Sequence, residues 1–125
     1  MQKRRVVVTG MGCLTPVGNT IGQFWDSILA GKSGVSEITS FDAKDMTVKF
    51  SASVKDFDVE KYLDIKEQRK MDLFMQYGMA AGIDAISDSG INDEELDRER
   101  IGISIGSGIG GLKLIENTHM VYEKS

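Results

Sequence analysis

Two stretches decide the fold that this sequence predicts: residues 5–10, RVVVTG, and residues 101–111, IGISIGSGIGG. Each begins with a largely apolar, β-branched run and continues into glycine. Apolar runs of this kind are typical of strands that are buried on both faces, as in a parallel sheet. We therefore predict strands over residues 5–10 and 101–105, with glycine-rich loops after them at 11–18 and 106–111.

Helical periodicity occupies much of the sequence between these stretches. Residues 19–31, NTIGQFWDSILAG, contain a capping box, because Thr20 and Gln23 stand three residues apart at the start of an apolar face. Gly31 stands where a helix-ending residue is expected. A longer helix is predicted over about 60–88, because apolar and small residues recur at spacings of three and four: Met71, Phe74, Met75, Gly78, Met79, Gly82, Ile83 and Ile86.

The remaining segments complete the order of elements. Residues 48–54 alternate apolar and polar and give a weak strand signal. Residues 91–100 are an acidic, solvated connector, and a third helix is expected from Leu112 onward. Strands and helices in this order predict an α/β fold whose sheet is incomplete, because convincing strands are few.

Composition limits the classes of function. The 125 residues suit one domain, and a net charge of −4 disfavours a nucleic-acid binder. One cysteine excludes an internal disulfide framework, and one histidine argues against a Cys/His zinc site, so no metal is expected. The sequence has neither a secretory leader nor a membrane span, so a cytoplasmic location is expected.

The glycine loop allows two interpretations. Gly106, Gly108 and Gly111 match G-x-G-x-x-G between a predicted strand and a helix, the context of a dinucleotide-binding turn. The strand with an acidic residue that should follow is not in the sequence, so close backbone packing is the favoured alternative.

Three further features have a functional and a plain interpretation. Cys13 could be a nucleophile, but a role as a buried small apolar residue is favoured because no histidine is near it in sequence. His119, on the third predicted helix, is expected to have a surface or packing role. Lys66, Arg69 and Lys70 point away from the apolar stripe on a helical wheel, so they are either solvated charge or a docking site for an acidic partner.

Several segments, taken together and in order, resemble the start of the β-ketoacyl-[acyl-carrier-protein] synthases, and in particular their elongating branch. These segments are RRVVVTGMGCLTPVGN, FWDSILAGKSG, FD, KFSASVKDFD, KEQRKMDLFMQYGMAA, DSG and IGISIGSGIGGL. The resemblance extends over essentially all 125 residues. It implies a thiolase-like fold, of which residues 1–125 are part of the N-terminal half, in a homodimeric enzyme.

The resemblance also implies a reaction and its residues. The family performs a decarboxylating Claisen condensation between an acyl thioester on a cysteine and malonyl carrier protein, with no cofactor. The family's cysteine and histidine motifs do not occur in this sequence, so no catalytic residue is assigned and Cys13 and His119 do not inherit those roles. By the resemblance, Ile109 with its neighbour Gly108 borders the acyl pocket, and Lys66, Arg69 and Lys70 dock the acidic acyl carrier protein.

Three functional hypotheses follow. The first is a segment of a fatty-acid-elongating synthase that is inactive alone. The second is a non-catalytic partner, either a chain-length-factor-like subunit or a carrier-docking fragment. The third is a small dinucleotide-binding module at residues 106–111.

Overall fold

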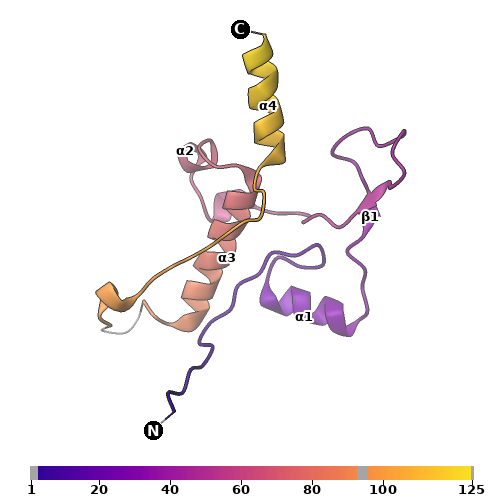
Figure 1. Cartoon of the computed structure of the whole chain (residues 1–125). Helices are drawn as coiled ribbons and strands as arrows, with labels where there is room; N and C mark the ends of the chain where they lie inside the picture. The colour runs from indigo at the N-terminus through magenta and orange to yellow at the C-terminus, as the bar shows by residue number, and fades with distance from the viewer. Residues whose placement is uncertain (1–2, 93–95, 125) are drawn as a thin grey trace.

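The structure is a computed structural model that describes residues 3–92 and 96–124. Helices supply most of its regular structure (Figure 1). Along the chain the elements are α1 (Ile21–Leu29), β1 (Ser36–Glu37), β2 (Phe50–Ser51), the 3₁₀ turn η1 (Val59–Lys61), α2 (Ile65–Gln68), α3 (Leu73–Ser89), the 3₁₀ turn η2 (Arg98–Arg100) and α4 (Leu112–Glu123).

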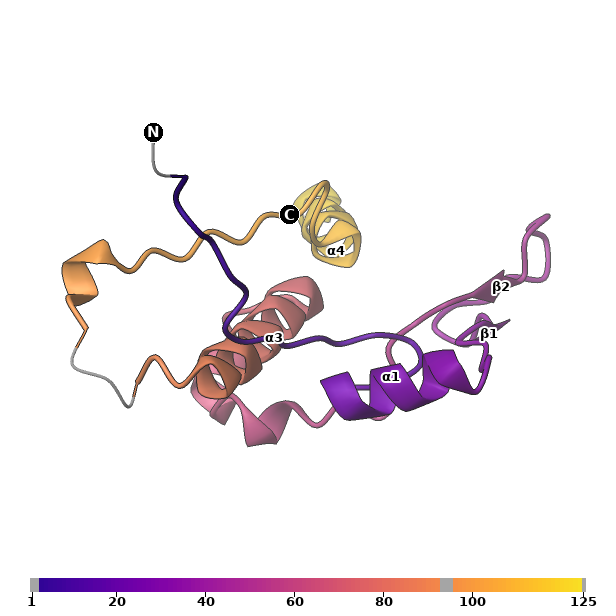
Figure 2. The same cartoon turned by 90° about the horizontal axis from the view of Figure 1, so that it is seen from below.

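The central element is α3, which the N-terminal segment crosses in Figure 2, and residues of both glycine-rich stretches contact this helix. A Cβ added to Gly10 or Gly12 would collide with the backbone of α3 at Ala85 or Ala81. The N-terminal segment can therefore approach the helix only because these two positions have no side chain. Ile105, just before the second glycine loop, also contacts α3. Its methyl groups lie 3.4 and 3.6 Å from the positions that added Cβ atoms would take on Gly78 and Gly82.

The two predicted buried strands are wrong for the described chain. Residues 5–10 and 101–105 are extended, but neither belongs to a sheet. A strand requires a neighbour that accepts and donates its backbone hydrogen bonds, and α3 cannot do this. The apolar side chains are also exposed rather than buried, with Val6 at 90% and Ile103 at 69% of their full exposure.

The sheet that the structure does contain is small and antiparallel. Ser36 pairs with Ser51 and Glu37 with Phe50. The second of these strands falls inside the alternating segment 48–54, so that signal is confirmed in part. With helices beside a short sheet, the α/β fold class is confirmed.

Local capping signals were accurate for α1 and inaccurate for the long helix. Thr20 caps α1 by accepting a hydrogen bond from the Gln23 amide at 3.2 Å, and Gly31 has the left-handed φ of +63° after its end. The single helix predicted over 60–88 is wrong, because Asp64 and Asp72 interrupt it. Both are extended N-cap residues whose side chains accept backbone amides, so new helices begin after them.

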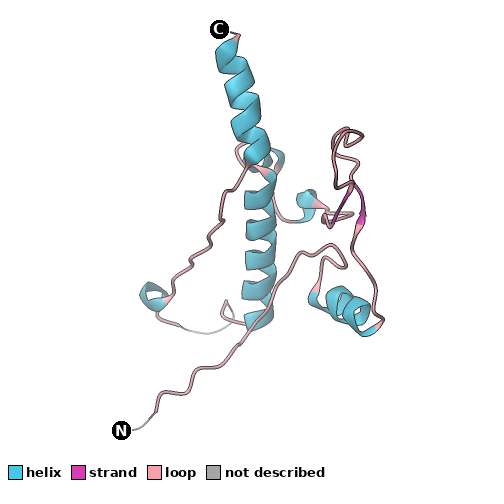
Figure 3. Ribbon diagram, turned by 45° about the vertical axis from the view of Figure 1, so that its right-hand side comes forward, coloured by secondary structure: helices cyan, strands magenta, loops and turns pink. Residues whose placement is uncertain are grey.

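The last segments extend away from the rest. The acidic connector contains η2, and its residues 93–95 lie outside the described chain. The predicted helix from Leu112 is confirmed as α4, which projects past the N-terminal end of α3 (Figure 3). No helix in the described residues is both long and apolar enough to cross a lipid bilayer.

Very little of the described chain is buried. The buried hydrophobic residues are Ala43, Leu63 and Ala80, and the accessible surface is 10894 Å². A compact protein of this mass would expose about 6,600 Å². Many large apolar side chains are exposed, including Trp25 at 57% and Leu29 at 69% on the apolar face of α1.

Candidate functional site

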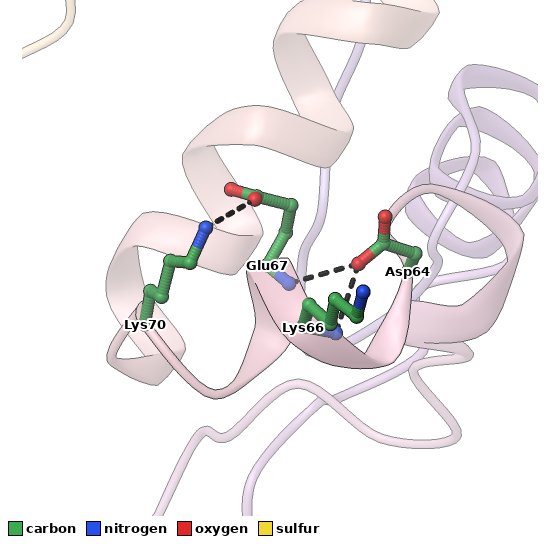
Figure 4. A network of polar contacts seen from close by, with 4 residues as sticks. All are labelled: Asp64, Lys66, Glu67 and Lys70. Atoms are coloured by element: carbon green, nitrogen blue, oxygen red, sulfur yellow. Dashed lines mark hydrogen bonds and ion pairs between the residues drawn. The ribbon is translucent and has the colours of Figure 1, made fainter.

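The three cations that the sequence singled out lie on the short helix α2 and just after it, because Lys66 is inside the helix, Arg69 is its C-cap residue and Lys70 is in the turn that follows. Lys66, Arg69 and Lys70 are all exposed, as the helical wheel predicted. Asp64 fixes the start of this helix, because its Oδ1 accepts the amides of Lys66 at 2.8 Å and Glu67 at 2.9 Å (Figure 4). One carboxylate oxygen thus satisfies two of the amides that a helix start leaves unpaired.

The cations differ in what they contact. Lys70 Nζ lies 2.6 Å from Glu67 Oε1 in an ion pair whose side chains are 67% and 42% exposed. Within the described chain, the side-chain cations of Lys66 and Arg69 make no ion pair. Two of the three cations are therefore available to an incoming anion without exchange of a partner.

Two side-chain amides hold α2 in place, one by a bond to the residues before it and the other by bonds from α3. Gln68 Nε2 donates to the Leu63 carbonyl at 2.8 Å. Gln76, on α3, donates from Nε2 to the carbonyls of Gln68 and Met71, both at 3.1 Å. A four-residue helix has too few internal bonds to be stable alone, so these contacts hold the cations in place.

An aromatic cluster anchors the segment before α2 to α3. Tyr62 donates from its hydroxyl to Asp84 Oδ2 at 2.9 Å, and its ring stacks on Phe57 at a centroid distance of 6.1 Å. Phe57 meets Tyr77 edge to face at 5.1 Å. Lys61 donates to the Tyr62 hydroxyl, and this hydrogen bond, followed by the charges of Tyr62 and Asp84, raises the pKa of Lys61.

The glycine loop has a packed end and an open end. A Cβ on Gly110, whose φ is +77°, would lie 3.1 Å from the Phe74 ring, and one on Gly111 would collide with the Asp72 carboxylate. A Cβ on Gly108 would meet nothing within 4 Å, and Ile109 is 74% exposed. Among the three motif glycines, the interpretation of close packing is thus confirmed for Gly111 and is wrong for Gly106 and Gly108, whose added Cβ atoms would meet nothing within 4 Å. The assignment of Gly108 and Ile109 to an acyl pocket remains a prediction.

Neither Cys13 nor His119 has the surroundings of a catalytic group. Burial, and then the negative charge of Asp84, raises the pKa of the half-buried Cys13 thiol. A raised pKa disfavours the nucleophilic thiolate, so the packing role is favoured. His119 is exposed on α4, and its Nε2 lies 3.3 Å from Glu123 Oε1, a partner that the sequence analysis did not identify.

A groove with a volume of about 610 Å³ lies beside the start of α1. Polar residues line much of it, among them Asn19, whose Oδ1 is buried without a hydrogen-bond partner in the described chain. No group of three or more His, Cys, Asp or Glu side chains in the described ranges could hold a metal ion. The groove therefore offers polar contacts without an obvious reacting group.

Sequence reasoning missed the residues that support the cations. Asp64 and Glu67 have the spacing of a capping box, which begins two residues before Lys66. The role of Gln76 had no local signal, because its bonds join two separate helices.

The whole described chain matches a family model. Residues 3–125 match the N-terminal domain of the β-ketoacyl synthases, and the chain belongs to that family. It is 56% identical over 119 residues to 3-oxoacyl-[acyl-carrier-protein] synthase 2 of Vibrio cholerae, which corresponds to 95% of this chain and 29% of that protein. The enzyme of the same name from Synechocystis is 43% identical, again over 29% of its length. The chain therefore spans about three-tenths of these curated relatives.

Solved structures give the same fold. The ishigamide ketosynthase/chain length factor superposes with a TM-score of 0.73 at 23% identity, over 98% of this chain and 31% of that chain. A type II polyketide ketosynthase, solved in complex with its acyl carrier protein and bound to the hexaketide, gives 0.69 at 25% identity, over 97% of this chain and 32% of that one. The thiolase-like ketosynthase fold expected from the sequence is thus confirmed.

Proposed function

We propose that residues 1–125 form part of the N-terminal half of a 3-oxoacyl-[acyl-carrier-protein] synthase of the type 2 kind, which elongates fatty acids. The identity of 56% to the Vibrio cholerae enzyme is the observation on which this proposal rests. In the complete enzyme an acyl chain on a cysteine is attacked by the carbanion equivalent that malonyl carrier protein yields on losing carbon dioxide. The product is a 3-oxoacyl carrier protein.

The role of this region in the reaction is to bind the carrier. Lys66, Arg69 and Lys70 are exposed on α2 and the turn that follows it, and hydrogen bonds hold both the start and the end of this segment. Clustered cations attract an acidic protein and accelerate its encounter. One of the similar solved structures is itself a ketosynthase in complex with an acyl carrier protein.

The glycine loop supplies part of the acyl pocket. Ile109 presents an exposed apolar side chain, and Gly108 leaves the backbone beside it without a Cβ. A lipid chain can approach such a backbone closely. The rest of the synthase supplies the nucleophile and the groups that stabilise the enolate, so this chain is inactive alone.

The cellular setting is a cytoplasmic homodimer that uses no cofactor. The uncovered apolar surface of the described chain supports burial against further protein. A dinucleotide-binding function has little support, because residues 3–125, the glycine loop included, match the β-ketoacyl synthase family.

Charge reversal tests the docking role. In the complete synthase, Lys66→Glu, Arg69→Glu and Lys70→Glu together are expected to raise the KM for acyl carrier protein by ~10-fold or more, with salt reducing the difference. Turnover of a small-molecule acyl thioester should not change. Lys44→Glu, a reversal at another exposed lysine, is the control. An unchanged KM in the triple variant would refute the docking surface.

A further inference from the structure

Among the proposed docking cations, Lys70 already has an anionic partner within this chain, because it forms an ion pair with Glu67 of α2, which we call the docking helix. Glu67 is the third residue of α2, where a glutamate commonly reaches back to the N-cap amide. Here its Oε1 reaches forward to Lys70 Nζ at 2.6 Å. The neighbouring acid, Asp64, is used differently, since its Oδ1 accepts two backbone amides. Glu67 is therefore the acid on this helix whose contact is with a docking cation.

We propose that Glu67 is a specificity-determining residue that competes with the carrier protein for Lys70. This inference rests on the proposed docking function. In the free protein Glu67 holds Lys70, and an acidic partner must exchange with it to use that cation. Lys66 and Arg69, which make no ion pair within the described chain, receive the partner first.

The pair is suited to exchange because it is exposed. Ion pairs between exposed side chains are weak, since water and salt screen them. An isolated carboxylate on a partner gains little binding free energy by replacing Glu67. It forms the same single ion pair with Lys70 that Glu67 formed, and no other contact positions it. A partner that already contacts Lys66 and Arg69 presents its next acid at high effective concentration. Glu67 thus favours surfaces with clustered acids over isolated carboxylates.

The test is carrier-protein binding to the complete synthase at low and high salt. Glu67→Gln keeps a residue that suits the same helix position and removes the charge. It is expected to tighten carrier binding about two- to fivefold at low salt, with a smaller gain at high salt. Asp42→Asn is the matched control, because it removes one charge from the exposed pair of Asp42 and Lys44 elsewhere on the chain. Its affinity should stay near that of the unchanged protein.

A second background identifies the mechanism. If Glu67 acts through Lys70, the gain from Glu67→Gln disappears in a protein that already carries Lys70→Met. A gain that persists there, or a Glu67→Gln variant that binds no tighter, overturns the competition. Arg69→Ala separates this result from failure of the docking surface. Weakened binding in that variant supports the surface on its own, whereas unchanged binding overturns the surface and the competition together.

Discussion

Asp64 is the residue on which the docking helix most depends. Its Oδ1 accepts two amides, at 2.8 and 2.9 Å, at the start of a helix only four residues long. Replacement of an N-cap aspartate by alanine costs about 1 kcal/mol, with a range of roughly 0.5–2 kcal/mol. Because α2 has one turn, this loss is expected to appear as local opening of that turn rather than as global unfolding.

The expected magnitude can be measured at single amides. A cost of about 1 kcal/mol increases the open population about fivefold, so hydrogen exchange at Lys66 and Glu67 should accelerate by that factor in Asp64→Ala. In the complete synthase, the KM for the carrier should rise severalfold, because the cations lose their fixed spacing. The turnover number on a small acyl thioester should stay the same.

Asparagine at the same position separates the cap from the charge. Asn caps helices about as well as Asp, so Asp64→Asn should retain slow exchange at both amides. It also removes a negative charge beside the cations, so carrier binding should be equal or slightly tighter. If the asparagine and alanine variants exchange equally fast, the hydrogen bonds of Asp64 do not hold α2 and the reasoning fails.

Two further predictions concern packing and protonation. Gly12→Ala should lower the free energy of unfolding by about 1–3 kcal/mol, because its Cβ would meet the α3 backbone at Ala81. Gly22→Ala, inside α1 with nothing within 4 Å of its Cβ, should instead be neutral or stabilising, and equal urea midpoints for the two variants would contradict the packing. The raised pKa of Cys13 should shift its alkylation rate profile to higher pH than that of a free thiol, since only the thiolate reacts. Asp84→Asn should move the profile back toward lower pH, and an unshifted profile in both proteins would contradict the burial and charge assigned to this thiol.

Local signals in the sequence were sufficient where the cause of the structure is itself local. The capping box of Thr20 and the glycine at 31 locate both ends of α1, because each acts on amides or carbonyls within one turn. The break before α3 also has a local cause, Asp72, but the apolar periodicity on its C-terminal side concealed it. The exposure of the three cations could be predicted, whereas the bonds of Gln76 that hold their segment depend on how two helices meet.

The predicted strands failed for a different reason. Residues 5–10 and 101–105 have the composition of buried strands, and both are extended in the structure. Extension is a property of the segment, but a strand is a property of a pair, because its backbone groups must bond to a neighbour. The last residue of each segment, Gly10 or Ile105, lies against α3, whose backbone groups already bond within the helix. The isoleucines and valines of these segments, which the sequence pattern predicts to be buried, are therefore exposed in this chain. We expect the same segments to become strands when the rest of the synthase supplies a sheet edge, with slowed exchange of their amides as the measurable sign.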